Sequence, residues 1–283
     1  MGKLILSVMI PAYDASATLA ASVKSALRDL PHNSEVLIYL DGPDPKASKV
    51  IEALKDNRIR VLESSENRGE FHARNMLVDN ARGKFVANLD ADDITLPNRF
   101  KRQIKLLESG YGDIVFSNSI HLSRRSRIIA LRPNWPFPMS HSVSPMALAL
   151  YDPFVNSTMA CRLTTIARLD GYHDFPGTDY EMWIRAALRG LRLARDNKYG
   201  VLYRVHEKQL TQSISWHESL QSDGVLLDTK RLLWNELGIL DSNGQLNVDA
   251  ASKLLRKSSK TAEIEFFGIA EFVKQISFRR RSD

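Results

Sequence analysis

The chain has 283 residues and a formal net charge of +6, with 43% hydrophobic and 25% charged residues. This length suits one large α/β domain, or a core with an extension, and the composition is ordinary for a soluble globular protein. The single cysteine, Cys161, excludes an intramolecular disulfide and is compatible with a reducing compartment. The positive charge suggests an anionic partner such as a nucleotide, a nucleic acid or an acidic membrane surface.

The first apolar run, Leu4–Ile10, is followed directly by Pro11. It is too short for a secretory signal peptide and has no small-residue cleavage site after it. No segment approaches the roughly 18 to 20 apolar residues that span a bilayer. We therefore expect a cytoplasmic protein.

Strand and helix patterns alternate along the first part of the chain. Apolar, β-branched runs predict strands at residues 4–10, 35–40, 58–62 and 85–89. Helical spacing predicts helices between and after them, at residues 19–30, 45–54, 69–80 and 97–109. This alternation is typical of an α/β fold with a mostly parallel, doubly wound sheet.

The pattern changes after a predicted strand at residues 113–118. Residues 114–151 contain no Asp or Glu but several prolines and four arginines, which are Arg124, Arg125, Arg127 and Arg132. We expect a long irregular segment here, either a binding surface for an acceptor that carries phosphate or a flexible loop. Strands are predicted again at 157–162 and 201–205, with a helix after Thr178. From Trp216 onward the pattern is helical, and an apolar helix at 262–278 precedes three arginines.

Three carboxylates, Asp90, Asp92 and Asp93, come directly after the predicted strand at 85–89. The carboxyl ends of such strands are where open α/β sheets bind ligands. Carboxylates this close repel one another unless a positive charge is present, and a hard divalent cation with sites left open for phosphate fits that role. The cluster indicates chemistry on a phosphorylated substrate such as a nucleotide.

Four blocks of sequence then follow one another in a recognisable order. They are Ser-Val-Met-Ile-Pro-Ala-Tyr at 7–13, Leu-Asp-Gly at 40–42, Asn-Arg-Gly and Ala-Arg-Asn at 67–75, and Gly83 leading to Leu-Asp-Ala-Asp-Asp at 89–93. Together they resemble a family-2 glycosyltransferase of the GT-A fold. The segments 178–185 and 203–206 are similar to acceptor-side motifs of that family. The resemblance covers roughly residues 4–215.

The resemblance implies a division of the chain. We expect a GT-A catalytic domain at 1–215, with a nucleotide-sugar half at about 1–118 and an acceptor-side half at about 119–215. A C-terminal helical extension would follow at 216–283.

Several residues would then bind the donor nucleoside. The resemblance places Pro11, Ala12 and Tyr13 against the nucleoside, with Tyr13 packed on the base. Asp41 would accept a hydrogen bond from the base, whose identity stays open because uracil, thymine and guanine all offer an N–H. The alternative for both groups is an ordinary strand-ending turn, with Tyr13 simply packed.

The resemblance also indicates which residues would bind the diphosphate of the donor. Arg74 would contact phosphate oxygens, unless it is a solvated helix charge. Asp92 and His206 would hold Mg²⁺ or Mn²⁺, while Asp90 would meet the ribose or a metal-bound water. We expect Asp93 to cap the following segment. The alternative for all three aspartates is a solvated turn.

Asp179 is the expected catalytic base. Thr178 and Glu181 have the spacing of a capping box, which would place Asp179 in the first turn of a helix. It would remove the proton of the acceptor hydroxyl, although helix-dipole preference alone also favours an acid there. Trp183 and Arg185, on the same helix, are candidate acceptor contacts, with burial in the core as the alternative for Trp183.

The function expected from these residues is inverting, metal-dependent transfer of a sugar from a nucleoside-diphosphate sugar, with a UDP-sugar favoured. The acceptor would be a glycan or a lipid-linked acceptor in polysaccharide or cell-envelope synthesis. The rivals are a sugar-phosphate nucleotidyltransferase and a non-enzymatic nucleic-acid-binding protein, and we expect no nucleic-acid partner. The apolar helix at 262–278 either lies peripherally at the inner face of the membrane or packs on protein.

Overall fold

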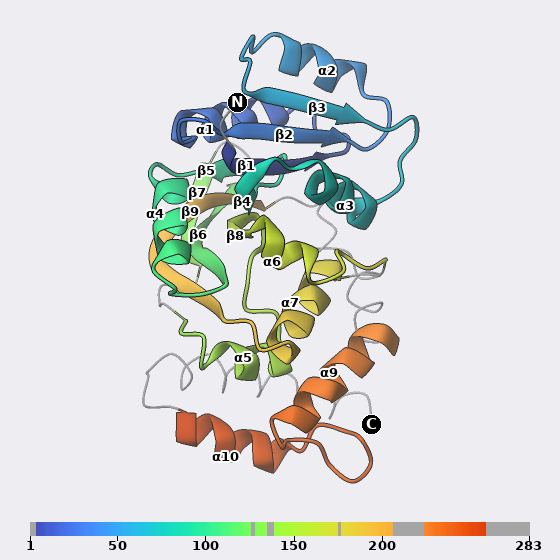
Figure 1. The fold of residues 1–283 in the computed structure, drawn as a ribbon, viewed down its shortest axis with the longest axis vertical. Coiled ribbons are helices and arrows are strands. Elements are labelled where there is room, and N and C mark those ends of the chain that lie inside the picture. Colours follow the sequence, from blue (N-terminus) through green and yellow to red (C-terminus); the bar gives the residue numbers. More distant parts are fainter. Residues whose placement is uncertain (1–3, 126–127, 135–138, 175–176, 206–223, 259–283) are drawn as a thin grey trace.

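The computed structural model describes residues 4–125, 128–134, 139–174, 177–205 and 224–258. Figure 1 shows a central sheet flanked by helices, with two further helices at the end of the molecule opposite β3. In chain order the elements are β1 (Leu4–Ala12), α1 (Leu19–Asp29), β2 (Glu35–Leu40), α2 (Pro45–Glu52), β3 (Ile59–Glu63), α3 (Glu70–Asn80), β4 (Gly83–Asn88), β5 (Ile94–Thr95), α4 (Arg99–Glu108), β6 (Ile114–Arg125), β7 (Ile128–Asn134), α5 (Ser144–Leu150), η1 (Asn156–Thr158), β8 (Met159–Arg162), α6 (Leu163–Ala167), α7 (Thr178–Leu188), β9 (Leu193–Val205), α9 (Gly224–Glu236) and α10 (Val248–Ser258).

The sheet has the order β3-β2-β1-β4-β8-β6-β9-β5, and β7 pairs with β6 off this path. Strands β3, β2, β1 and β4 are all parallel, as the alternating pattern predicts. Strand β8 then runs antiparallel to β4 and to β6. The α/β fold is confirmed, but the sheet as a whole is mixed rather than mostly parallel.

The segment expected to be irregular is mostly regular. Strand β6 continues to Arg125 and pairs antiparallel with β7, and α5 follows. Pro133 is tolerated because β7 is paired only with β6 and so needs no second ladder of hydrogen bonds. Side chains between 123 and 138 lie outside the described ones, so the proposed role of the arginines there stays a prediction.

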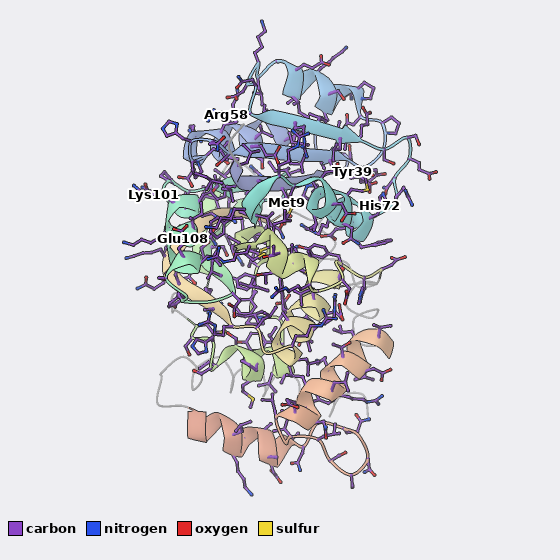
Figure 2. All side chains as sticks on the ribbon, viewed as in Figure 1. Met9, Tyr39, Arg58, His72, Lys101 and Glu108 are labelled. Carbon is purple, nitrogen blue, oxygen red and sulfur yellow. The ribbon has the colours of Figure 1, made fainter. Side chains whose placement is uncertain are left out.

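The side chains of β1 alternate between the two faces of the sheet, and this alternation explains the two layers of helices. One face of the sheet buries Leu6, Val8 and Ile10 together with residues of α1, α2 and α4. The other face buries Met9 and Tyr39 together with residues of α3 and α7. Figure 2 shows Met9, Tyr39 and His72 near one another, and the Tyr39 and His72 rings meet edge to face with centroids 5.9 Å apart. Successive side chains of a strand point to opposite faces, so both layers need apolar residues.

The described part of the C-terminal extension packs on the core. Helix α9 buries Leu226, Leu233 and Trp234 in the same apolar cluster as α5 and α7. The Trp234 Nε1–H donates to the Ala149 carbonyl at the end of α5, at 2.8 Å. Among the described residues, no helix combines the length and apolarity needed to cross a membrane. The apolar helix expected at 262–278 and the boundary expected near 215 lie outside the described residues.

Candidate active site

The turn that carries the aspartates is fixed by hydrogen bonds from both sides. The backbone N–H of Asp90 donates to Ser157 Oγ at 3.0 Å, and the Asp90 carbonyl accepts from Ser22 Oγ at 2.9 Å. Ser157 belongs to η1 and Ser22 to α1. The carboxylates therefore stand at a fixed place at the carboxyl end of β4, as expected.

Arg74 is buried beside this turn. Its Nε and Nη2 donate to Glu70 Oε1 at 2.9 and 2.6 Å, and Nη2 also donates to Asp90 Oδ1 at 3.0 Å. Only 6% of the Arg74 side chain is exposed, so the alternative of a solvated helix charge is wrong. Helix α3 buries this charge because two carboxylates satisfy it. Contact with phosphate stays a prediction for this residue.

Asp92 and Asp93 lie differently from each other. Asp92 is half-buried, while Asp93 is fully buried and its Oδ1 accepts from the Arg204 backbone N–H at 2.8 Å. Burial and the charges of Asp90 and Asp92 raise the pKa of Asp93 well above its usual range. The expectation that Asp93 caps the following segment is wrong, because that segment forms β5 and pairs with β9.

Asp179 lies in the first turn of α7, as predicted. Burial and the charges of Glu70 and Asp90 raise its pKa to about 6, and Arg74 opposes them. Because these charges act on Asp179, it lies within electrostatic reach of the network at the end of β4. The base expected from the sequence and the aspartate turn therefore share one charged environment.

The capping box is wrong, although the helix position is right. The residue before α7 is Gly177, in a left-handed conformation with φ 76°, and no side chain caps the helix. Glu181 instead pairs with Arg185 one turn on, with Nη2–Oε2 at 2.8 Å. An arginine at i+4 offers two hydrogen bonds to this buried carboxylate, which a backbone cap cannot match.

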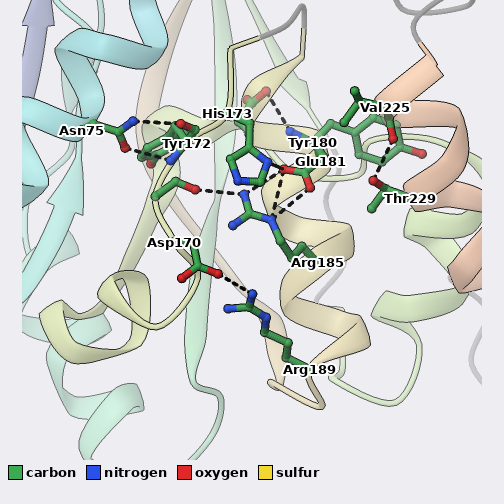
Figure 3. Close-up of polar contacts among 12 residues, drawn as sticks. Asn75, Asp170, Tyr172, His173, Tyr180, Glu181, Arg185, Arg189, Val225 and Thr229 are labelled. Atoms are coloured by element: carbon green, nitrogen blue, oxygen red, sulfur yellow. Dashed lines mark hydrogen bonds and ion pairs between the residues drawn. The ribbon is translucent and has the colours of Figure 1, made fainter.

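A loop clamps α3 and α7 to each other, as Figure 3 shows. Asn75 of α3 exchanges two hydrogen bonds of 2.8 Å with the backbone of Tyr172, and Arg185 of α7 donates to the Gly171 carbonyl at 2.9 Å. Gly171 has φ +73°, and a Cβ there would lie 2.5 Å from Asn75 Oδ1. A side chain at this position would be strained and would displace Asn75, so glycine preserves the contact between α3 and the loop before α7.

Two candidate acceptor contacts have structural roles instead. Trp183 is fully buried, and its ring meets Phe116 edge to face with centroids 5.1 Å apart, so stacking of Trp183 on a sugar is wrong. Arg185 is committed to Glu181 and to the loop before α7. We correct its assignment from an acceptor contact to a residue that fixes α7.

The residues predicted to bind the nucleoside gather at the ends of β1 and β2. Ala12 pairs with Leu40, which brings Pro11, Ala12 and Tyr13 next to Asp41. Tyr13 is 66% exposed, so the alternative of a packed ring is wrong and the ring is open to a ligand. Asp41 is buried, and its two oxygens accept from the backbone N–H groups of Arg68 and Gly69, each at 2.9 Å. Nucleoside binding by these residues stays a prediction.

Two acidic residues near Asp179 escaped the sequence analysis. Glu70 could have been found from its i, i+4 spacing to Arg74. Asp152 follows α5 and ends the acid-free segment. Protein atoms around it and the charge of Asp179 raise the pKa of Asp152 well above its usual range, although the side chain keeps contact with solvent. Only the fold brings Asp152 near α7.

A divalent cation at the end of β4 stays a prediction. In the part of the chain that the structure describes, no group of three or more His, Cys, Asp or Glu side chains could hold a metal. The charge of Asp92 raises the pKa of both Asp90 and Asp93, so the three carboxylates repel one another. Mg²⁺ commonly takes only one or two carboxylates and completes its shell with phosphate and water, which is compatible with a site of this kind. Of the two predicted ligands, Asp92 lies at this turn and His206 lies outside the described residues.

Comparisons with known proteins agree with this geometry. A family model described as Glycosyl transferase family 2 matches residues 7–161. The UDP-Glc:alpha-D-GlcNAc-diphosphoundecaprenol beta-1,3-glucosyltransferase WfaP of Escherichia coli is 25% identical over 222 residues, which are 78% of this chain and 85% of that protein. WfgD of the same organism, which is described by the same activity, is 34% identical over 128 residues, or 42% of this chain and 50% of that protein.

A solved structure shares the fold. The structure of S. aureus TarS 1-349 in complex with UDP-GlcNAc matches with a TM-score of 0.62 and 17% identity, covering 91% of this chain and 74% of that one.

Proposed function

This chain belongs to glycosyl transferase family 2, and on that premise we propose that it transfers a sugar from a UDP-sugar to a hydroxyl of a lipid-diphosphate-linked glycan, with inversion at the anomeric carbon. The family assignment confirms the expected glycosyltransferase. The observation that carries the mechanism is the shared charged environment of Asp179 and the aspartate turn at the end of β4.

Asp179 supplies the base. A carboxyl with a pKa of about 6 is ionised at neutral pH and is a stronger base than an ordinary aspartate. It takes the proton of the acceptor hydroxyl as that oxygen bonds to the anomeric carbon. The bond from the anomeric carbon to the diphosphate breaks on the opposite side, so one displacement suffices and no covalent intermediate forms.

The donor choice is supported by two groups of relatives. WfaP and WfgD are described as acting with UDP-Glc, and TarS has been solved with UDP-GlcNAc and with UDP. In this chain the open Tyr13 ring suits stacking on a base, and Asp41 next to it suits an imide N–H. The same two Escherichia coli relatives are named for an acceptor linked through diphosphate to undecaprenol.

The proposal includes a divalent ion, Mg²⁺ or Mn²⁺, held by Asp92. Around the turn, Asp90, Asp92, Asp93 and Glu70 face Arg74, Arg99 and Arg204, and burial together with repulsion among the carboxylates raises the pKa of Asp90 and of Asp93. A bound ion would relieve that repulsion and supply charge neutralisation for the departing diphosphate. Asp90 would then orient the ribose or a water of that ion.

We propose that the enzyme acts at the cytoplasmic surface of a membrane. The chain has a formal charge of +6 and a pI near 9.4, which favours attraction to anionic lipid. This attraction would bring the enzyme to a lipid-linked acceptor.

A thermal-shift panel of UDP, GDP, dTDP and CDP, each with and without Mn²⁺, tests the donor. We expect UDP with Mn²⁺ at about 100 times its Kd to raise Tm by on the order of 5 °C. Asp41→Asn should weaken the UDP effect, and Asp92→Asn should abolish the added effect of Mn²⁺. Equal stabilisation by all four diphosphates would contradict the assignment.

The reaction product tests the chemistry. Incubation with a UDP-sugar and a polyprenyl-diphosphate-linked N-acetylglucosamine should release UDP. Release of pyrophosphate would instead indicate the nucleotidyltransferase alternative, which the family assignment disfavours.

A further inference from the structure

Glu70 is the residue of the charged network that the mechanism above leaves without a role. It begins α3, one turn before Arg74, and its side chain is 42% exposed. Both hydrogen bonds from Arg74 to it end on the same oxygen, Oε1. A single carboxylate oxygen therefore accepts from two N–H groups on one edge of the guanidinium.

The start of α3 is itself fixed by the predicted nucleoside side. Asp41 accepts hydrogen bonds from the backbone N–H groups of Arg68 and Gly69, which directly precede Glu70. Glu70 then binds Arg74, and Arg74 binds Asp90. These contacts form a continuous chain from the end of β2 to the end of β4.

Glu70 is one of several groups that hold Arg74 in place. Arg74 Nη2 also donates to Asp90 at 3.0 Å, its Cζ lies 5.8 Å from the centre of the Tyr172 ring, and the Asn156 amide oxygen, in one of its two orientations, lies 3.2 to 3.3 Å from the guanidinium nitrogens. Glu70 accepts the shortest of these bonds, at 2.6 Å, and shares the guanidinium charge with Asp90, so its loss would loosen the orientation of the guanidinium.

We propose that Glu70 is a positioning residue for sugar transfer: its Oε1 fixes Arg74 against Asp90, and its negative charge adds to the field at Asp179. The proposal rests on the assignment of Asp179 as the base. It gives Glu70 two separable actions, one through a hydrogen-bond acceptor and one through charge.

The charges around Asp179 come from several elements. Helix α3 contributes Glu70 and Arg74, the turn after β4 contributes Asp90, and the loops before α7 and after α5 contribute Tyr172 and Asp152. Glu70 and Asp90 raise the pKa of Asp179, as does its burial, and Arg74 lowers it. Loss of the Glu70 charge alone should therefore lower that pKa and make Asp179 a weaker base.

Three variants separate the two actions. Glu70→Gln keeps an oxygen that can accept both bonds from Arg74 but removes the charge. Glu70→Ala removes the acceptor and the charge together. Asp79→Asn is the matched control, because Asp79 is an exposed acid on the same helix and makes no hydrogen bond or ion pair with the described residues of the site.

The readouts are kcat for UDP release across pH 5 to 9, with KM for the donor and the Tm of each variant. For Glu70→Gln we expect kcat near pH 8 within about fivefold of the parent, and an acidic limb moved down by roughly half a pH unit. For Glu70→Ala we expect kcat to fall on the order of tenfold or more, because Arg74 is no longer fixed. The control Asp79→Asn should match the parent in kcat and in the pH of the acidic limb.

A direct titration separates this inference from the proposed function. The ¹³C carboxyl signal of Asp179, assigned with Asp179→Asn, should titrate at lower pH in Glu70→Gln even without substrate. An unchanged titration, or a Glu70→Ala enzyme with parental kcat and an intact fold, would overturn the inference. A parent enzyme that releases no UDP, with the titration shifted as expected, would instead count against the proposed function alone.

Discussion

Replacement of Arg74 by methionine removes a buried charge while it keeps most of the side-chain volume. Arg74 holds Asp90 and Glu70, whose side chains are 27% and 42% exposed. Removing one partner from a fully buried pair costs about 3–5 kcal/mol. Because solvent screens both carboxylates here, we expect Arg74→Met to lower the free energy of unfolding by about 2–3 kcal/mol at pH 7.5.

The loss of unfolding free energy in Arg74→Met should depend on pH, and the direction of that dependence follows from the titration of the carboxylates. Burial already raises the pKa of Asp90, and Arg74 is the main group that lowers it. Without Arg74 the folded-state pKa of Asp90 rises further above its unfolded value. Such a group destabilises the fold once it is ionised, so stability falls as pH rises through the folded-state pKa. The deficit of the variant should therefore be smaller at pH 5.0 than at pH 7.5.

Urea unfolding at both pH values measures this, with Arg82→Met as the control. Arg82 is exposed, and its side chain makes no hydrogen bond or ion pair with the described residues, so Arg82→Met should change stability by less than about 0.5 kcal/mol. Equal deficits at the two pH values, or a deficit below about 1 kcal/mol, would refute the view of Arg74 as the counter-charge of this site.

Four further substitutions test other parts of the site. Asp179→Asn should lower kcat by on the order of 10² to 10⁴ while UDP affinity by calorimetry stays unchanged, and a similar loss of affinity would point to a donor-binding role. Trp183→Ala should cost about 3–5 kcal/mol in urea unfolding, whereas Tyr13→Ala should leave stability intact and weaken UDP binding. Asp93→Asn should be as stable as the parent or more so at pH 7.5, because burial and its neighbours disfavour its charge. Destabilisation of Asp93→Asn by more than about 1 kcal/mol would contradict that reading.

Much of the parallel half of the sheet could be predicted from periodicity. The predicted strand at 35–40 matches β2, and the predicted helix at 69–80 differs from α3 by one residue. The hairpin of β6 and β7 could not be predicted in this way, because prolines and a basic composition masked a strand that pairs on one side only.

The residues of the candidate site also fall into two groups, those that could be predicted from the sequence and those that depended on the fold. The position of each residue in the sequence predicted that Asp90 lies at the end of a strand and that Asp179 lies in the first turn of a helix. The partners of Arg74, Arg185 and Glu181 depended on which side chains the fold brought within hydrogen-bond distance.

The sequence by itself determined the order of strands and helices in the parallel half of the sheet, the family, and the carboxylates that lie where strand and helix end, because these follow from local spacing and from residue types in fixed blocks. Only the tertiary structure decided that Trp183 is buried, that Tyr13 is open, and that Glu70, Arg74 and Asp90 form one network with Asp179 nearby. Spacing fixes which face of an element a residue occupies, but burial and charge pairing depend on what packs against that face.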